Sequence, residues 1–468
     1  MINLKRNVFI ATEQLRALGE GFETADYRKN LIGFVDWSNL MGKKNVLIFP
    51  AGTEIAFEIV NALKYSKFVN LIGGTSVTDH SEFVFNNLIN GFPYIHEEGS
   101  LDFLNKAIKE YKIDCVYPAH DSVSVFLSDH AQDIDAQVII AEKFTTDICR
   151  SKAETYQYLC GESFIPKIYR NIDEIAKYPV FIKPAIGQGS NGAKLIHSRD
   201  ELVAAFAADH SIVICEYLPG MEYTVDCFTD KNGRLLVSKM RDRERIRSGI
   251  AVRSKNVRID EEITRIATIL NSKFKFKGAW FFQVKKDEHG TFKLLEISPR
   301  IPGTMGLSRN IGINFPMLTL FTFWGYDVSI IDNDYSILLD RAFYSAYKID
   351  ITYNHIYLDF DDTLIIEDKV NQDLMRFIYQ EINKGKTISL LSKHKTDIYS
   401  DLKKYHISEG LFSEIVVIPV EDEKFQYINR KDAIFIDDSF AERKKISDRC
   451  GIKVFDVDMV ESLMDWRV

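Results

Sequence analysis

Hydrophobic and polar positions follow strand and helix periods in turn from residue 44 onwards. Residues 45–50 form a β-branched and aromatic run that predicts a buried strand, and apolar positions in 55–63 follow at helical spacing. Further strands are predicted at 69–72 and 114–118, with a helix at 101–111 between them. Strands that alternate with helices indicate a parallel, doubly wound, Rossmann-like sheet over residues 44–150.

Ligands bind such sheets at the carboxyl ends of the strands. The polar or turn residues at the predicted strand ends are Asp79, Pro118, His120 and Asp121. For any one of them, ordinary turn chemistry is the more common explanation. Residues 1–43 carry no motif and form an N-terminal extension to which we assign no function.

A glycine-rich loop lies between two predicted strands in the middle of the chain. The strand at 180–182 delivers Lys183, Pro184 ends it, and a second strand follows at 193–196. The glycines between the strands are Gly187, Gly189 and Gly192. Glycine lets backbone N–H groups surround an anion, so this strand–loop–strand pattern is that of a flap over phosphates. An ordinary glycine-rich hairpin is the alternative.

The residues that follow the loop supply polar groups on predicted strands. Residues 213–220 form a strand that ends in a hinge, and Glu222 begins an alternating strand. The run 239–247 is basic, although the chain as a whole is acidic. It is either a solvated face or, together with Arg253, a site for an anionic acceptor substrate.

Two apolar strands at 279–284 and 294–300 carry buried polar residues. Gln283 and Glu296 lie among apolar neighbours, where a carboxylate is costly unless it is paired or bound to a metal. Ser298 shares a strand face with Glu296. Oxygen ligands on adjacent strands suit Mg²⁺, and Arg300 follows closely enough to clamp a phosphoryl group.

Two helices complete this part of the chain. Ser151 is a predicted N-cap for a helix that begins with Lys152. The apolar segment 315–324 is too short to span a bilayer and is expected to be a core helix.

Residues 44–345 resemble an ATP-grasp carboxylate–amine ligase, similar to the halves of the carbamoyl-phosphate synthase large subunit. The resemblance rests on the lysines, the glycine flap, the Glu-Tyr-Leu-Pro-Gly hinge and the Gln283/Glu296 pair together. It implies a Rossmann-like pre-ATP-grasp domain over 44–150 and an ATP-grasp domain over 151–345. ATP and Mg²⁺, with Mn²⁺ as an alternative ion, are the implied cofactors.

The resemblance also implies a role for each matching residue. ATP would be bound by Lys152, Lys183, Gly187, Gly189, Ser190, Gly192, Glu216, Leu218 and Glu222. The metal ligands would be Gln283, Glu296 and Ser298, and Arg300 would bind the transferring phosphate. The family usually has asparagine where Ser298 stands. Independently of the resemblance, the basic run makes Arg241, Arg243, Arg247 and Arg253 candidates to contact an anionic acceptor.

The implied reaction suits these residue types. A carboxylate is a poor electrophile until the γ-phosphoryl group of ATP converts it to an acyl phosphate, which an amine can attack. Lysines, arginine and Mg²⁺ neutralise the polyanion, and a closing flap excludes water from the intermediate. The expected substrates are a small-molecule carboxylate and an amine.

The last third begins a new series of strands and helices. A hydrophobic strand ends in D-x-D-x-T at residues 359–363, a second strand ends at Ser392, and a third ends at the acid pair of Asp437. With Lys424, these four motifs make residues 354–468 resemble the haloacid-dehalogenase (HAD) superfamily of phosphatases. The residues between 363 and 387 leave room for one helix and no cap domain, so an open, capless site is expected.

The HAD resemblance implies specific chemistry. Asp359 would attack phosphorus to form an aspartyl phosphate, and Asp361 would act as general acid and then as base. Mg²⁺ would be held by Asp359, the backbone carbonyl of Asp361, and Asp437. Ser392 and Lys424 would hold the phosphoryl oxygens. In addition, Asp438 would orient the metal shell or Lys424, and Thr363 would support the loop.

Composition and charge narrow the classes of protein to which the chain can belong. The 468 residues suggest roughly three domains, and a net charge of −8 argues against sequence-independent nucleic-acid binding. The six cysteines form no metal-ligand spacing, and the N-terminus lacks a signal-peptide pattern. We therefore expect a cytoplasmic protein with no membrane or nucleic-acid partner, small-molecule substrates that include a phosphorylated compound, and a homodimer as an open option.

Two alternatives to a two-enzyme chain remain open. In one, the first two thirds bind ATP as a sensor and only the HAD-like part is catalytic. In the other, the HAD-like part is a docking or dimerisation module.

Overall fold

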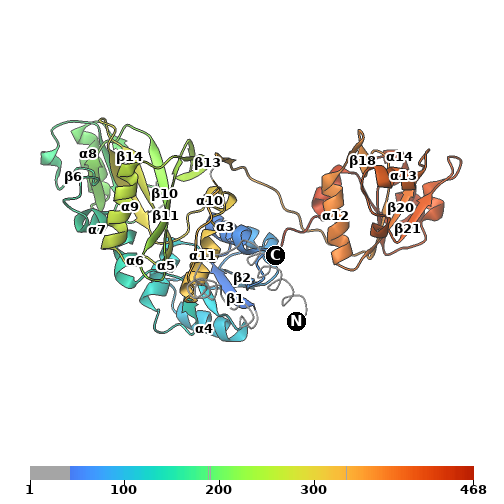
Figure 1. Cartoon of the computed structure of the whole chain (residues 1–468), viewed down its shortest axis with the longest axis horizontal. Coiled ribbons are helices and arrows are strands. Elements are labelled where there is room, and N and C mark those ends of the chain that lie inside the picture. Colours follow the sequence, from blue (N-terminus) through green and yellow to red (C-terminus); the bar gives the residue numbers. More distant parts are fainter. Residues whose placement is uncertain (1–42, 188, 190, 334, 468) are drawn as a thin grey trace, which may run out of the picture.

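The computed structural model describes residues 43–187, 189, 191–333 and 335–467. The predicted N-terminal extension lies outside this range up to residue 42, and so does Ser190 of the predicted flap. The described strands form one parallel sheet, two antiparallel sheets, a second parallel sheet and a small hairpin (Figure 1). The mixed α/β fold expected from the pattern is confirmed.

The first part is a five-stranded parallel sheet in the order β3-β2-β1-β4-β5. Its strands are β1 (Lys44–Phe49), β2 (Val69–Thr75), β3 (Leu88–Asn90), β4 (Cys115–Pro118) and β5 (Gln137–Val138). Its helices are α3 (Glu54–Leu63), η2 (His80–Phe83), α4 (Ser100–Glu110), α5 (Asp121–Asp129) and α6 (Lys143–Arg150). The predicted parallel sheet is confirmed, except that β2 continues through Gly73 and Gly74. A Cβ at Gly73 would lie 2.8 Å from the side chains of Phe85 and Leu88, so the glycine allows close packing there.

The second part contains two antiparallel sheets. The smaller sheet has the order β6-β9-β7-β8, and the larger has the order β12-β13-β11-β10-β14-β15, with β16 paired to β13. The smaller sheet is formed by β6 (Ile168–Tyr169), β7 (Val180–Pro184), β8 (Lys194–Ile196) and β9 (Ile212–Glu216). The larger sheet is formed by β10 (Glu222–Thr229), β11 (Leu235–Asp242), β12 (Arg245–Arg247), β13 (Ile250–Val257), β14 (Gly278–Lys286), β15 (Phe292–Ser298) and β16 (Leu338–Asp340).

Helices of the second part connect these sheets and pack against them. They are α7 (Lys152–Tyr158), η3 (Ile172–Glu174), α8 (Arg199–Ala208), α9 (Glu261–Lys273), α10 (Gly306–Asn310) and α11 (Phe315–Phe323). The expected core helix is α11, whose buried residues include Phe315 and Leu320. One hydrophobic core contains both of these residues together with Val46 and Ile59 of the first sheet unit, so the first two parts pack against each other.

The C-terminal part is a five-stranded parallel sheet in the order β21-β20-β17-β22-β23. Its strands are β17 (His355–Leu358), β20 (Thr387–Ser392), β21 (Glu414–Val417), β22 (Ala433–Ile436) and β23 (Lys453–Phe455). Its helices are α12 (Gln372–Asn383), α13 (Ile398–Lys404), η4 (Glu409–Leu411), η5 (Lys424–Tyr427), α14 (Phe440–Cys450) and η6 (Asp458–Leu463). A two-stranded hairpin, β18 (Ile365–Ile366) and β19 (Lys369–Val370), precedes α12, so the segment expected to hold one helix also holds a small hairpin.

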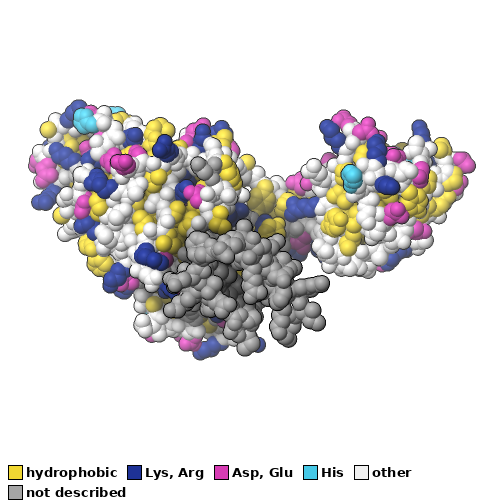
Figure 2. Space-filling view, viewed as in Figure 1, with side chains coloured by type: hydrophobic (Ala, Val, Ile, Leu, Met, Phe, Trp, Pro, Cys, Tyr) yellow, Lys and Arg dark blue, Asp and Glu magenta, His cyan; other side chains and the backbone are white. Residues whose placement is uncertain are grey.

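The C-terminal part has hydrophobic clusters of its own, and Figure 1 shows it beyond an extended segment that follows β16. Acidic and basic side chains are interspersed over the face of the described residues that Figure 2 shows. None of the helices in the described part of the chain has the length and apolar character needed to cross a bilayer.

His355 links the stability of the C-terminal part to pH. Its imidazole is buried on β17, with Nδ1 2.7 Å from Thr387 Oγ1, and burial together with the charge of Arg430 lowers the pKa of His355 to about 4. The unfolded chain takes up a proton near pH 6.5 and the folded chain does not. Above pH 6.5, His355 therefore does not change the free energy of unfolding. As the pH falls from 6.5 to 4, its titration progressively lowers the free energy of unfolding.

We expect His355→Gln to remove this dependence. Between pH 7 and 4.5, the wild type should lose about 2–3 kcal/mol more unfolding free energy than the variant, measured by urea denaturation of the C-terminal transition. The exposed His406→Gln variant is the control and should keep the wild-type slope. Equal slopes for His355→Gln and the wild type would contradict the assignment.

Candidate functional site

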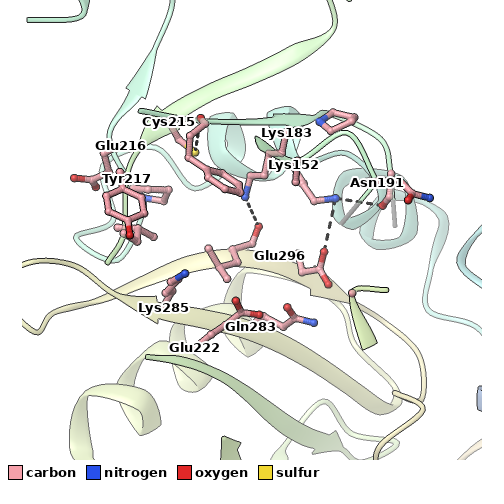
Figure 3. Close-up of a pocket in the computed structure, with 18 of the residues that line it drawn as sticks. Lys152, Lys183, Asn191, Cys215, Glu216, Tyr217, Glu222, Gln283, Lys285 and Glu296 are labelled. Carbon is pink, nitrogen blue, oxygen red and sulfur yellow. Dashed lines mark hydrogen bonds and ion pairs between the residues drawn. The ribbon is translucent and has the colours of Figure 1, made fainter. Parts of the chain in front are cut away.

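A cleft lies between the two antiparallel sheets. The smaller sheet and the start of α7 form one wall, and strands β10, β14 and β15 form the other (Figure 3). The predicted nucleotide and metal residues that line the cleft are Lys152, Lys183, Gly187, Gly189, Glu216, Leu218, Glu222, Gln283 and Glu296. Residues predicted from separate segments of the sequence therefore meet in one cavity.

The two lysines reach the cleft from different elements. Ser151 caps α7 by accepting a hydrogen bond from the Glu154 backbone, as predicted, and this fixes Lys152 in the first turn. The Lys152 ammonium lies 3.7 Å from Glu296 Oε2 and donates to the Gly187 carbonyl at 3.3 Å. On β7, Lys183 is 6% exposed and donates to the carbonyl of Leu295 on β15 at 3.0 Å (Figure 3).

Burial makes both ammonium groups energetically costly. It lowers the pKa of Lys152 and of Lys183, while Glu296 opposes the shift at both. The carboxylates around the two lysines offset their desolvation only in part, so an added anion would be bound favourably between them. The electrostatics of this wall therefore favour a polyanion.

The glycine loop connects the two strands of a hairpin. Strands β7 and β8 pair antiparallel, with a register that runs from Val180↔Ile196 to Ile182↔Lys194. Gly189 and Gly192 have φ of +62° and +73°, values that other residues rarely adopt. At its tip the loop touches Gly249, where a Cβ would lie 2.2 Å from the Gly189 carbonyl carbon. The predicted strand–loop–strand arrangement is confirmed, and Gly187 and Gly189 of the loop line the cleft.

The hinge residues meet the cleft in two ways. The Glu216 side chain accepts from the Lys167 N–H at 2.8 Å, the Glu216 N–H donates to the Lys167 carbonyl at 2.9 Å, and both Glu216 and Leu218 line the cleft. Glu222 forms an ion pair with Arg243, with Oε1 and Nε 2.7 Å apart, and both side chains line the cleft. A ribose contact through Glu222 would therefore also involve Arg243.

Gln283 and Glu296 are opposite each other in the register of β14 and β15, and both line the cleft. Oxygen donors on paired strands fit Mg²⁺. Ser298 and Arg300 do not line the cleft. Ser298 Oγ donates to Asp121 at 2.9 Å, and the Arg300 guanidinium is bidentate to the same carboxylate at 2.7 and 2.6 Å. The predicted metal role of Ser298 and phosphate role of Arg300 therefore do not match the contacts that these side chains make here.

Among the polar residues at the strand ends of the first sheet, Asp121 forms hydrogen bonds to residues of the second part of the chain. Asp79 and His120 cap η2 and α5, which is the turn chemistry considered for them. Asp121 holds Arg300 and Ser298 across the boundary. Burial opposes its ionisation, but the charge and hydrogen bonds of Arg300 keep the pKa of Asp121 well below its usual range.

The four arginines proposed for the acceptor do not form one site. Arg241 is buried in an ion pair with Asp226, Arg253 pairs with Glu244 and Asp340, and Arg247 stacks on Phe343. Arg243 alone among the four lines the cleft. The four arginines lie on different segments, with Arg241 on β11, Arg243 between β11 and β12, Arg247 at the end of β12 and Arg253 on β13.

Sequence reasoning missed Lys285, which lines the same cleft from β14. It lies two residues after Gln283, and its Cα is paired with that of Glu222. The period of two along a strand places both on one face, and this signal was present in the sequence.

A second cluster lies at the carboxyl ends of the C-terminal strands. The carboxylates of Asp359, Asp437 and Asp438 each offer an oxygen within 4.8 Å of the others, and Lys424 contacts Asp359 at 2.8 Å and Asp437 at 2.6 Å. Burial and the neighbouring Asp359 raise the pKa of Asp437 to about 6, and burial raises that of Asp359. Three converging carboxylates suit a hard divalent cation.

Two details of this cluster differ from the sequence analysis. Lys424 contacts Asp359 and Asp437, whereas Asp438 exchanges hydrogen bonds with Thr363, the expected loop support. The Asp361 side chain turns to Ser392, at 3.3 Å, and to His394. Burial opposes protonation of His394, but hydrogen bonds to Asp361 and Asp401 raise its pKa.

Comparison with known proteins supports the fold of the first two parts. Residues 208–336 match a family described as "ATP-grasp in the biosynthetic pathway with Ter operon". Biotin carboxylase from Campylobacter jejuni, in complex with β,γ-ATP, is 17% identical, with a TM-score of 0.53 over 64% of this chain and 76% of the other.

Two further structures of similar fold point the same way. The biotin carboxylase domain of Hydrogenobacter thermophilus 2-oxoglutarate carboxylase, with MgADP, is 15% identical, with a TM-score of 0.54 over 64% of this chain and 74% of the other. N5-carboxyaminoimidazole synthetase from Staphylococcus aureus, with ADP, is 16% identical, with a TM-score of 0.52 over 62% and 80%. The chain therefore contains an ATP-grasp domain. The family match ends before the C-terminal sheet begins.

The buried pair of Arg241 and Asp226 yields a stability prediction. Nε and Oδ2 are 2.9 Å apart, and both side chains are almost fully buried. Arg241→Ala would leave the carboxylate without its partner, and we expect a loss of about 3–5 kcal/mol in unfolding free energy, measured by chemical denaturation.

Arg199→Ala is the matched control for that measurement. It breaks the pair with Asp173, whose side chains are both exposed, and should leave the transition unchanged. If both variants unfolded at the wild-type denaturant concentration, the buried pair would not have the importance given to it here.

Proposed function

We propose that residues 44–345 form an ATP-dependent ligase that joins a carboxylate to an amine through an acyl phosphate, releasing ADP and phosphate. In this proposal residues 44–150 are the pre-ATP-grasp domain and residues 151–345 the ATP-grasp domain. The observation that carries the proposal is the pair of buried lysines facing Gln283 and Glu296 across one cleft. Cations on one wall and oxygen donors on the other are what a metal-bound triphosphate requires.

Each wall has a role in the proposed reaction. Lys152 and Lys183 hold phosphate oxygens, and the glycine flap closes over them to exclude water. Backbone groups near Glu216 and Leu218 bind the adenine, and Glu222 binds the ribose. Gln283 and Glu296 hold Mg²⁺, which supplies charge neutralisation to the phosphates when bound. The related structures described above contain ATP- or ADP-type nucleotides, which is consistent with this assignment.

In the proposed reaction, Arg300 binds the transferring phosphoryl group only after its contact with Asp121 changes. Its guanidinium is bidentate to Asp121, so contact with a transferring phosphoryl group requires it to share or leave that carboxylate. We propose that this occurs when the substrates bind. The nucleophile and the acceptor carboxylate are small molecules, and Arg243 is the arginine best placed to meet the acceptor.

An assay with ATP, Mg²⁺ and pooled carboxylates and amines tests the ligase. We expect substrate-dependent ADP release by the wild type, at least a tenfold loss of ATP affinity in Lys183→Ala, and loss of turnover in Glu296→Ala, because each change removes a group that holds the triphosphate or its metal. Lys194→Ala, an exposed lysine on β8, is the control and should behave as the wild type. Tight ATP binding with no turnover on any pool would favour the ATP sensor instead.

We further propose that residues 354–468 form a Mg²⁺-dependent phosphatase of the HAD type. The observation that favours it is the convergence of Asp359, Asp437 and Lys424 at the carboxyl edge of a parallel sheet. Asp359 attacks phosphorus, Asp361 protonates the leaving oxygen and then deprotonates water, and Ser392 and Lys424 hold the phosphoryl oxygens. Asp359, Asp437 and the Asp361 carbonyl would hold Mg²⁺, which would supply screening of the charge between the carboxylate and the phosphate.

The substrate of this second enzyme is proposed to be a phosphorylated precursor or product of the ligase reaction, and both enzymes are proposed to work in the cytoplasm. Asp359→Asn should abolish hydrolysis of 4-nitrophenyl phosphate in the presence of Mg²⁺, because the amide cannot attack phosphorus. Asp448→Asn, on the outer surface of α14, should retain full activity. Hydrolysis that persists in Asp359→Asn would support the docking-module alternative.

A further inference from the structure

His394 lies in the loop after β20, two residues beyond Ser392. Its side chain is 8% exposed, and its ring packs edge-on against Phe360 at 5.1 Å between centroids. Phe360 stands between Asp359 and Asp361 in the sequence. The imidazole is therefore packed directly beside the segment that carries the proposed nucleophile and the proposed general acid.

Both ring nitrogens of His394 have carboxylate partners. Nδ1 lies 2.9 Å from Asp361 Oδ2 and 3.1 Å from Oδ1, and Nε2 lies 2.8 Å from Asp401 Oδ2. Thr396 Oγ1 joins the contact at Nε2. It lies 2.8 Å from His394 Nε2 and donates to Asp401 Oδ2 at 2.7 Å. Asp401 and Thr396 thus fix the ring, and the ring contacts both oxygens of Asp361.

The Asp361 side chain needs such a partner. It is 51% exposed, so packing does not select its rotamer, and its other side-chain contact is the longer one from Ser392 at 3.3 Å. A general acid or base works only within hydrogen-bond reach and with correct alignment. The Asp361 carboxylate, which must reach the leaving oxygen, is therefore held by the His394 ring. The ring is in turn held by Asp401 at its other nitrogen.

We propose that His394 is a positioning residue that orients Asp361 in the phosphatase reaction, an inference that rests on the phosphatase function proposed above. In the first step Asp359 forms a bond to phosphorus, the bond from phosphorus to the leaving oxygen breaks, and that oxygen takes the proton of Asp361. In the second step water attacks the aspartyl phosphate and gives its proton to Asp361, which releases phosphate and regenerates Asp359. His394 remains hydrogen-bonded to Asp361 and exchanges no atoms with the substrate.

Leaving-group dependence tests this role, because a misaligned acid matters most when the leaving group is a poor one. The probes are phenyl phosphate and 4-nitrophenyl phosphate, assayed with the full chain and Mg²⁺. His394→Gln places an amide near the position of Nε2 and loses the contact with Asp361. We expect its kcat to fall about tenfold more on phenyl phosphate than on 4-nitrophenyl phosphate, in the same direction as Asp361→Asn, with KM little changed.

Two variants complete the experiment. His394→Asn places an amide near the position of Nδ1, keeps a donor for Asp361, and should recover most of the loss on phenyl phosphate. Lys395→Ala, an exposed residue of the same loop, should match the wild type on both probes. The thermal transition of each variant shows that the C-terminal part is folded.

Each remaining outcome has a defined meaning. Equal losses on the two probes in His394→Gln, or no recovery in His394→Asn, would overturn the positioning role while leaving the phosphatase intact. A wild type that hydrolyses neither probe would overturn the phosphatase and this inference together.

Discussion

The site depends on one electrostatic constraint, which is that two ammonium groups are largely desolvated in a cleft whose carboxylates compensate them only in part. Lys152 comes from the start of a helix and Lys183 from a strand of the smaller sheet, and both face Glu296 on the larger sheet. Burial lowers the pKa of each lysine by more than the nearby acidic groups raise it. A bound polyanion would remove that cost, so the two sheets and the glycine flap form a framework suited to an anion.

The first sheet unit extends this site through one carboxylate. Asp121 lies at the start of α5, after the parallel strand β4, and holds both Arg300 and Ser298 of the ATP-grasp part. The two parts also share a hydrophobic core. This contact makes the first sheet part of the chemistry proposed for the second, since any movement of Arg300 toward a substrate changes a contact between them.

The C-terminal cluster relies on different physics. Three carboxylates and one lysine meet at the ends of parallel strands, and burial raises the pKa of Asp359 and Asp437 instead of leaving cations in excess. Such a cluster favours a cation, whereas the ATP-grasp cleft favours an anion. The hydrophobic clusters of this part are also its own. The chain therefore carries two electrostatically distinct sites in separately packed units.

The strands, the helices and much of the ATP-grasp cleft could be predicted from the pattern of residues. Period-two and helical patterns located the strands around Lys183, Gln283 and Glu296, because those patterns reflect burial on one face. Tertiary structure alone decided which charges are already paired. Arg241 is neutralised by Asp226, Arg300 is held by Asp121, and His394 reaches Asp361, and in each case the partner lies on another element. A linear pattern records the type and spacing of residues, but an ion pair depends on distances that only the packed sheets and helices set.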